Sequence, residues 1–379
     1  MTCTPNLHLA LLGFFFFFLS LPILSHCQSN PSSLPPPPNP RLERAYIALQ
    51  ALKHSITSDP KNLTFDWCGP DVCNYTGVFC APAPDDPHVE TMAGLDLNHG
   101  NLSGTLPEDL GLLSDLALLH LNSNRFRGPL PLSLRELRLL YELDVSNNRL
   151  DGPFPSVVLR LRSLKYLDLR FNGFTGGVPS EVFDLPLDAL FLNDNGFRFA
   201  IPENIGNSTV SALVLANAGL TGCLPRSIAG MGETLEEIVV LNNSITGCLP
   251  PEIGALRRLR VFDVSSNGLV GGLPEAMGAM ERLERLDVAH NSLSGEVPEA
   301  VCGLPRLKNF TYSYNFFYGE PMRCLKIRHV DDRENCIPHR PDQRPERECE
   351  AFLSKPVECE AFGCRRPPPP MHYPPPPYY

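Results

Sequence analysis

The pattern of apolar and polar residues repeats with a single period from Leu95 to about Pro321. The frame reads L-x-L-x-x-N-x-L-x-G-x-x-P, and in each unit two apolar residues, such as Leu119 and Leu121, alternate with polar ones. This alternation predicts a short strand with one face in the core. The Asn position of the frame recurs every 23 to 25 residues, at Gly100, Asn124, Asn148, Asn172, Asn195, Ala218, Asn243, Asn267, Asn291 and Asn315. So many matches to one period are the signature of a repeat architecture.

The residues that follow each strand predict how one unit closes. The Asn side chain stands where the strand ends, and it can bond backbone groups of neighbouring coils that would otherwise be buried without partners. A glycine four residues later permits a bend, and a proline then fixes the return segment. Because one coil cannot bury its own apolar face, the coils must stack. The sequence therefore predicts an α/β solenoid of about ten 24-residue coils over residues 93–322, with a concave sheet on the order of 45 Å long.

Both ends of such a stack would expose core, and both carry sequences that can cover it. Residues 41–92 are expected to form a helical, cysteine-containing N-terminal cap, because apolar residues recur at helical spacing before Asp59 and Pro60 end the helix. Residues 323–366 are cysteine-rich and form the expected C-terminal cap, or hinge. The helical positions are Leu42, Ala45, Tyr46, Leu49, Leu52 and Ile56.

The first residues read as a secretory leader. Leu9–Leu24 is an apolar run, and the small residues after it predict cleavage before Gln28, leaving residues 28–40 as a Pro-rich linker. An uncleaved anchor is the alternative, but Pro22 and the absence of a Lys/Arg cluster disfavour it. No second apolar run approaches the roughly 20 residues of a membrane span. The sequence thus predicts a secreted protein with no transmembrane segment after leader removal.

The cysteine count fits an oxidising compartment. Of 13 cysteines, 11 remain after the leader is removed, and there they are expected to form disulfides, with zinc disfavoured by the spacing. Cys223 and Cys248 occupy equivalent positions of adjacent coils, about 5 Å apart, so we predict a bond between them. Three connectivities are open among the four hinge cysteines. The expected disulfide cysteines are Cys73, Cys80, Cys223, Cys248, Cys302, Cys324, Cys336, Cys349, Cys359 and Cys364.

The charge argues against one class of partner and suits another. A net charge of -10 excludes a basic surface for nucleic acid. Most of the acidity lies in the repeats, which suits a cationic ligand, although a solvated acidic surface kept for solubility is an equal reading. No Ser/His/Asp grouping, metal cluster or phosphate loop is present in the sequence, so neither an enzyme nor a metal or cofactor site is expected.

Six sequons predict N-linked glycans on flanks that a partner does not use. They begin at Asn62, Asn74, Asn101, Asn207, Asn242 and Asn309.

Three segments together resemble the leucine-rich repeat extensins of the plant cell wall. The run from Asp71 to Pro82 is similar to that family's N-terminal cap, the ten repeats match its plant-type frame, and the segment from Asn315 to Cys364 resembles its cysteine-rich hinge. Two features depart from the family pattern. Residues 367–379 form only a short Pro/Tyr tail, without Ser before either Pro block, and Cys68 is extra to the cap motif. Cys68 is therefore the candidate for the odd thiol, which either links two chains as a homodimer or re-pairs the cap.

The resemblance implies a wall-associated regulator of growth that binds small basic cysteine-rich peptides of the rapid-alkalinisation type and bears on pectin and wall assembly. The concave positions available for such a ligand are Asp96, Asp144, Asp168, Phe171, Phe191, Asp263, Asp287 and Tyr314. Aspartate is, however, also common at these positions of plant-type repeats without any role in ligand binding. His99, His120 and His290 fall on the same face and would charge partly in an acidic wall, with surface filler as the simpler account. A secreted inhibitor of pectin-degrading enzymes is the alternative function, but it would not need the hinge or the tail.

Overall fold

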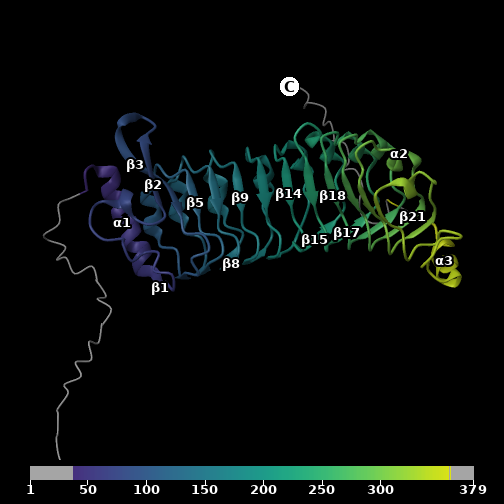
Figure 1. Ribbon diagram of the computed structural model, residues 1–379, viewed down its shortest axis with the longest axis horizontal. Coiled ribbons are helices and arrows are strands. Elements are labelled where there is room, and N and C mark those ends of the chain that lie inside the picture. The colour runs from purple at the N-terminus through teal and green to yellow at the C-terminus, as the bar shows by residue number, and fades with distance from the viewer. Residues whose placement is uncertain (1–36, 358, 360–379) are drawn as a thin grey trace, which may run out of the picture. The chain divides into compact units, whose positions relative to one another are not determined.

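The computed structural model describes residues 37–357 and 359, and these residues form the expected solenoid. Short strands stand side by side along the stack from the N-terminal cap to the hinge (Figure 1). No helix in this part of the chain is long and apolar enough to cross a bilayer. The leader, most of the linker, Cys364 and the short tail lie outside the described residues.

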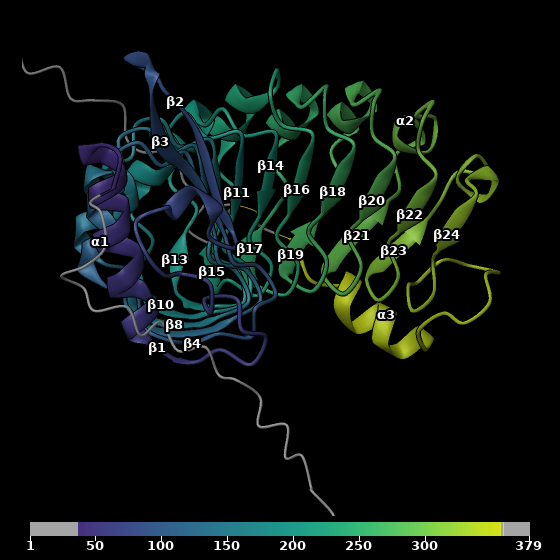
Figure 2. The same cartoon turned by 60° about the vertical axis from the view of Figure 1, so that its left-hand side comes forward.

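The strands of the repeat frame form a twelve-stranded sheet, called here the inner sheet, whose strands run parallel from β3 onward (Figure 2). The N-terminal cap adds β2 in antiparallel pairing with β3. In order, its strands are β2 (Val78–Ala83), β3 (Asp86–Asp96), β5 (Leu118–His120), β7 (Glu142–Asp144), β9 (Tyr166–Asp168), β11 (Ala189–Phe191), β14 (Ala212–Val214), β16 (Glu237–Val239), β18 (Val261–Asp263), β20 (Arg285–Asp287), β22 (Asn309–Thr311) and β24 (His329–Asp331).

The segments after the Asn position, together with β1 of the N-terminal cap, form two further six-stranded sheets. One contains β1 (Ile56–Ser58), β4 (Ser103–Gly104), β6 (Arg125–Gly128), β8 (Arg149–Pro153), β10 (Gly173–Gly176) and β12 (Gly196–Phe197). The other contains β13 (Phe199–Ala200), β15 (Leu220–Gly222), β17 (Ser244–Gly247), β19 (Gly268–Gly271), β21 (Ser292–Glu296) and β23 (Phe316–Gly319).

A helical turn follows the repeat proline in each coil, because proline fixes the φ that starts it. These turns are η3 (Glu108–Leu112), η4 (Leu132–Glu136), η5 (Ser156–Arg160), η6 (Ser180–Asp184), η7 (Glu203–Asn207), η8 (Arg226–Met231), η9 (Pro251–Ala255), η10 (Glu275–Ala279) and α2 (Glu299–Cys302). The caps add η2 (Val72–Asn74) and η11 (Cys324–Lys326).

The apolar positions of the frame form one continuous core. Leu121, Val145, Leu169 and Val264 are at most 1% exposed, and they belong to a cluster that runs from the first helix to the hinge. Each coil therefore buries its apolar face only against its neighbours, which makes stacking the source of stability. The predicted spine of the solenoid is confirmed.

The Asn position works as the sequence predicts. The amide of Asn124 donates to Leu97 O of the preceding coil at 2.8 Å and to Leu121 O at 3.0 Å, and its oxygen accepts from Leu102 N at 2.9 Å. The same bonds recur at the later Asn residues of the frame from Asn148 to Asn315, and Ala218 is the one position between them that has no side-chain amide. Each side chain thus satisfies buried backbone groups on two coils.

The N-terminal cap is built around α1 (Pro40–Ser55), whose first turn is capped by the Asn39 side chain. Its apolar stripe is buried against the first coil, except that Ile56 belongs to β1. Trp67 is 1% exposed, donates from Nε1 to Thr76 O at 2.9 Å and stacks on Tyr75. This packing closes the apolar end of the stack.

The hinge begins with an additional coil. Asn335, 20 residues after Asn315, donates to Tyr312 O and Asp332 O, both at 3.0 Å, and accepts from Phe317 N. This coil contributes β24 to the inner sheet. Its shorter spacing explains why the period in the sequence does not reveal it.

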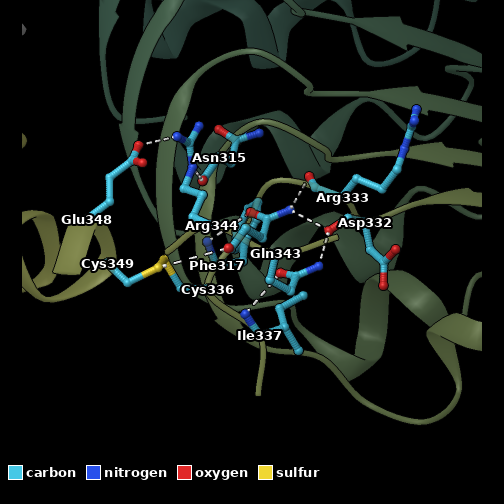
Figure 3. The surroundings of a disulfide bond; sticks show 11 residues. Asn315, Phe317, Asp332, Arg333, Cys336, Ile337, Gln343, Arg344, Glu348 and Cys349 are labelled. Atoms are coloured by element: carbon cyan, nitrogen blue, oxygen red, sulfur yellow. Dashed lines mark hydrogen bonds and ion pairs between the residues drawn. A yellow bond between two sulfur atoms is a disulfide. The ribbon is translucent and has the colours of Figure 1, made fainter. Parts of the chain in front are cut away.

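The helix α3 (Glu346–Leu353) covers the last coil (Figure 3). Cys336 is bonded to Cys349 on α3, Phe316 stacks on Phe352 with ring centroids 3.6 Å apart, and the Arg344 guanidinium lies 4.4 Å from the Phe316 ring centroid. The exposed end of the core is closed by these contacts.

The disulfides include one that the sequence pattern did not indicate. Cys73 is bonded to Cys80 and Cys302 to Cys324, whereas Cys248 is bonded to Cys359 of the hinge. The predicted Cys223–Cys248 bond is therefore wrong, because Cys248 is bonded to Cys359, a partner 111 residues away in the sequence. The expectation that the four hinge cysteines pair only among themselves is wrong for the same reason. Cys223 and Cys68 are themselves disulfide-bonded, so Cys68 is not the expected odd thiol.

Candidate ligand-binding face

The last residue of each inner strand from β3 onward belongs to one continuous row, called here the inner row. Strand register places each member directly beside the next across the inner sheet. The row reads Asp96, His120, Asp144, Asp168, Phe191, Val214, Val239, Asp263, Asp287, Thr311 and Asp331.

The inner row brings the expected aspartates together as two pairs. Asp144 lies beside Asp168, and Asp263 lies beside Asp287. Three apolar residues separate the pairs, which are about 19 Å apart at the usual strand spacing. Asp96 stands alone, because His120 comes between it and Asp144. His120 contacts Glu142 through Nε2 at 3.0 Å.

Each aspartate of the row also has a structural role. Its Oδ1 accepts from the backbone N–H two residues later, at 2.9 Å for Asp96, 3.0 Å for Asp144 and 3.1 Å for Asp168. The same bond measures 3.0 Å for Asp263 and 3.1 Å for Asp287. Short polar side chains make such local bonds where strands end. This local hydrogen bond partly explains why aspartate occurs at this position. Whether the carboxylate can also bind a ligand depends on its other oxygen, Oδ2.

At the first pair the second oxygen is already engaged. Asp168 Oδ2 lies 2.9 Å from Arg170 Nε and 3.4 Å from the Tyr166 hydroxyl. The Arg170 guanidinium also lies 5.1 Å from the Phe191 ring centroid, and Asp144 Oδ2 accepts from Asn122 at 3.3 Å. Arg170 thus makes the contacts that an incoming cation would make, which removes most of this pair's attraction for one.

Burial sets the protonation of Asp168. The Asp168 carboxyl is fully buried, and its pKa is raised to about 7 by burial first and by the nearby charge of Asp144 second. Arg170 acts in the opposite direction but does not offset the loss of hydration. Asp168 is therefore largely neutral in acidic surroundings.

At the second pair the second oxygen has no bonding partner among the described residues, although Asp263 itself is only 8% exposed. Ser265 donates from both its N–H and its hydroxyl to Oδ1 of Asp263, and Asp287 accepts from Ala289 N. In the described part of the chain neither Oδ2 has a hydrogen bond or an ion pair. Burial, and after it the adjacent charge of Asp263, raises the pKa of Asp287. Arg285 and His290 lie near Asp287 and partly offset its charge, but neither forms an ion pair with it. Two adjacent carboxylates that have no ion-pair partner attract a cation from a ligand.

Aromatic residues border this face at a strained backbone position. The third residue after each inner strand has positive φ, including Phe171 at 54°, His290 at 54° and Tyr314 at 58°. Phe171 and Tyr314 are 45% and 37% exposed, and His290 stacks on Tyr314 with ring centroids 4.2 Å apart. Positive φ is uncommon for aromatic side chains. The repeat geometry imposes positive φ at this position. It places the Phe171 ring beside the first pair and the His290 and Tyr314 rings beside the second pair. His99 occupies the same position at the N-terminal end.

Sequence reasoning missed three groups on this face. Asp331 extends the inner row in β24, but Arg333 contacts its two carboxylate oxygens at 2.8 and 2.9 Å. Tyr166 and Arg170 neutralise and cover Asp168. The arginines follow the aspartates by two residues, so the Asp-x-Arg spacing could have indicated self-neutralised positions. Among the described residues no cluster suited to a metal ion is found.

The six sequon asparagines are all exposed, but they do not all avoid the inner sheet. Asn309 is the first residue of β22, beside Arg285 of β20, and Asn242 occupies the positive-φ position after β16. Asn309 thus lies on the inner sheet and Asn242 in the turn after β16, so glycans at these two positions would lie near the candidate ligand face. The placement of glycans on flanks that a partner does not use stays a prediction.

Comparisons with known proteins agree with this architecture. Residues 46–81 match the family model "Leucine rich repeat N-terminal domain", and residues 139–161, 163–185 and 282–304 match "Leucine Rich Repeat". The chain is 60% identical over 352 residues to leucine-rich repeat extensin-like protein 6 of Arabidopsis thaliana, covering 93% of this chain and 75% of that one. It is 61% identical over 344 residues to protein 7 of the same series, covering 90% and 79%.

Solved structures share the fold at lower identity. The Arabidopsis receptor kinase HAESA, in complex with the peptide hormone IDA and the co-receptor SERK1, superposes with a TM-score of 0.64 at 26% identity, over 77% of this chain and 54% of that chain. A plant ice-binding protein superposes with a TM-score of 0.62 at 26% identity, over 76% and 94%. The same coils thus occur in proteins with unlike ligands, so the fold alone does not select one.

Proposed function

The chain belongs to the leucine-rich repeat extensin-like proteins of the plant cell wall, and from that premise we propose that its inner sheet binds small basic cysteine-rich signalling peptides and thereby regulates wall assembly and cell growth. Peptides of the rapid-alkalinisation type are the expected class. The observation that carries the proposal is the second pair, Asp263 and Asp287, which lie side by side on the inner sheet with Oδ2 of each outside any hydrogen bond or ion pair among the described residues.

The surroundings of this pair support a partly apolar cationic ligand. Val214 and Val239 continue the inner row on one side, and the His290–Tyr314 stack borders it on the other. Alternation of acidic and apolar contacts suits a folded peptide whose basic side chains are interspersed with apolar ones. The HAESA complex provides a precedent in which this kind of solenoid is solved with a peptide hormone.

A titration of the secreted chain with a small basic cysteine-rich peptide tests the proposal. The control peptide has the same disulfides, with Gln in place of its Lys and Arg. We expect binding of the basic peptide only, and affinity that falls as salt rises, because screening weakens charge pairs on an open surface. Equal binding of the control peptide would contradict a role for the aspartates.

The alternative, an inhibitor of pectin-degrading enzymes, makes a different prediction. It requires binding to a polygalacturonase rather than to a basic peptide. Family membership favours the peptide, and so does the elaborate hinge, in which Cys336–Cys349 and Cys248–Cys359 hold residues that repeats alone would not need. A polygalacturonase pull-down run beside the titration separates the two functions.

A further inference from the structure

A buried cluster of ionisable side chains holds the last coil together. Tyr312 follows β22, Glu320 follows β23, Asp332 follows β24, and Arg340 lies in the chain that leads to α3. The Glu320 side chain is 4% exposed and that of Asp332 is 10% exposed. Tyr312 is fully buried. Four segments of the chain thus meet at these side chains, called here the hinge cluster.

Two carboxylates in the hinge cluster compete for one guanidinium. Arg340 donates from Nε to Asp332 Oδ2 at 2.6 Å, and its Nη2 lies 2.5 Å from the same oxygen. Glu320 Oε1 lies 2.9 Å from Arg340 Nε, but it accepts no hydrogen bond from any residue that the structure describes. The other carboxylate oxygen of Glu320 accepts from the Tyr312 hydroxyl. With both carboxylates ionised, the cluster therefore has one more negative charge than positive charge.

Glu320 is the group that can remove this surplus by taking up a proton. A buried charge that is not fully compensated favours its neutral form. Burial first, and then the charge of Asp332, raise the pKa of Glu320 above its ordinary value of 4.5, against the opposing effects of Tyr312 and Arg340. These three are the titratable side chains that face Glu320 from the segments packed around it. Burial also raises the pKa of Tyr312, so its hydroxyl remains a donor.

The chain after β24 is attached to the last coil through the same cluster. Gln343 donates to Asp332 O at 3.0 Å and accepts from Ile337 N at 3.1 Å (Figure 3). The Asp332 side chain binds Arg340, so both ends of residues 332–344 depend on the position of Asp332. Asp332 directly follows Asp331, the last residue of β24. A change in the hinge cluster therefore reaches the last strand of the inner sheet.

We propose that the hinge cluster is a pH-sensitive latch, closed in acid and opened by a rise in pH, that controls the order of residues 332–344 and of β24. With Glu320 protonated, one carboxylate and one guanidinium remain, and their charges cancel. Ionisation of Glu320 leaves a buried surplus charge, which water can hydrate only if Arg340 and the chain around it move away. The Cys336–Cys349 bond keeps that movement local. The latch does not depend on the proposed peptide function.

Proton linkage sets the direction of this effect. Because the folded pKa of Glu320 is raised, the stability from this group is fully present below its ordinary pKa of 4.5 and is lost as the pH rises through the folded pKa. Local opening releases one proton, so its equilibrium constant should rise by up to about tenfold per pH unit above the ordinary pKa. The rise ends where the carboxyl of the closed form is itself ionised.

Amide hydrogen exchange of the full secreted chain, corrected for the intrinsic pH dependence of exchange, measures the latch. We expect the protection of residues 332–344 to fall at least about tenfold from about pH 4 to about pH 8, while residues 212–239 in the middle of the stack keep theirs. Glu320→Gln keeps the shape of the side chain but cannot ionise, so its protection should not depend on pH. The control Glu296→Gln, at an exposed glutamate of β21, should behave like the unmodified chain.

Tyr312→Phe provides a second test that stands even if Glu320→Gln does not fold. It removes the hydrogen bond that favours the ionised form of Glu320, so protection should level off at a higher pH than in the unmodified chain. Protection of residues 332–344 that does not change with pH would overturn the proposal. The same pH dependence in Glu320→Gln as in the unmodified chain, or a shift to lower pH in Tyr312→Phe, would also overturn it.

Discussion

Asp263 and Asp287 lie side by side on β18 and β20, and each uses only Oδ1 to bind its own backbone. Asp168 occupies the same row but is already paired with Arg170. Identical residue types at equivalent repeat positions therefore differ in what they offer a ligand. We therefore propose that a basic peptide binds the C-terminal half of the inner sheet, where the second pair has no ion-pair partner among the described residues, and not the first pair.

The first prediction concerns the stability of the buried carboxyl. Because the folded pKa of Asp168 is about 7, above the ordinary value of 3.8, the folded state binds its proton more tightly than the unfolded state. Stability from this group is thus greatest in acid and is lost as pH rises from about 4 to about 7. Asp168→Asn removes that loss and should stabilise the protein at pH 8 by about 1 to 4 kcal/mol, with little gain near pH 4.

Thermal unfolding at pH 4.5 and at pH 8 measures this effect. The exposed Asp109 of η3 provides the control, since Asp109→Asn should change Tm by the same amount at both pH values. A Tm difference for Asp168→Asn that does not grow with pH would mean that Arg170 keeps the carboxylate charged.

The second prediction concerns the hydrogen bonds made by the asparagines at the Asn position of the frame. Asn291 is 7% exposed, donates to Val264 O at 3.0 Å and Val288 O at 3.1 Å, and accepts from Leu269 N at 3.0 Å. Asn291→Ala leaves these buried groups without partners and should lower the free energy of unfolding by about 2 to 4 kcal/mol. Chemical denaturation of this variant beside Asn204→Ala, whose bonds are exposed, checks it. A similarly small loss of unfolding free energy in both variants would show that water replaces the hydrogen bonds of Asn291.

The inner sheet follows almost directly from the sequence. A period of 24 residues fixes strand spacing, and alternation then fixes which residues share the inner row, so Asp96, Asp144, Asp263 and Asp287 could all be placed in advance. The pairing of Asp168 with Arg170 could not, because it depends on side-chain packing within one coil. Asp331 was missed because the last coil is shorter than the period. The Cys248–Cys359 bond joins residues 111 apart, a contact that local spacing cannot indicate.

The third prediction concerns the sequon on the ligand face. Asn309 lies on β22 next to β20, which carries Asp287. A glycan there would obstruct the second pair, so Asn309→Gln in the secreted protein should tighten peptide binding at least about threefold. Asn62→Gln, in the exposed loop after β1, should have no effect. Glycopeptide mapping of the unmodified protein accompanies the titration. An unchanged affinity with an occupied Asn309 would place the peptide elsewhere.

The most direct test of the central claim reverses the second pair. Asp263→Lys/Asp287→Lys is compared with Asp109→Lys/Asp151→Lys, which changes net charge equally at exposed positions outside the inner sheet. Calorimetric titration with the basic peptide should show at least about a hundredfold loss for the first variant and less than about threefold for the second, because only the first places like charges against the ligand. Equal affinities in the two variants would contradict binding at Asp263 and Asp287.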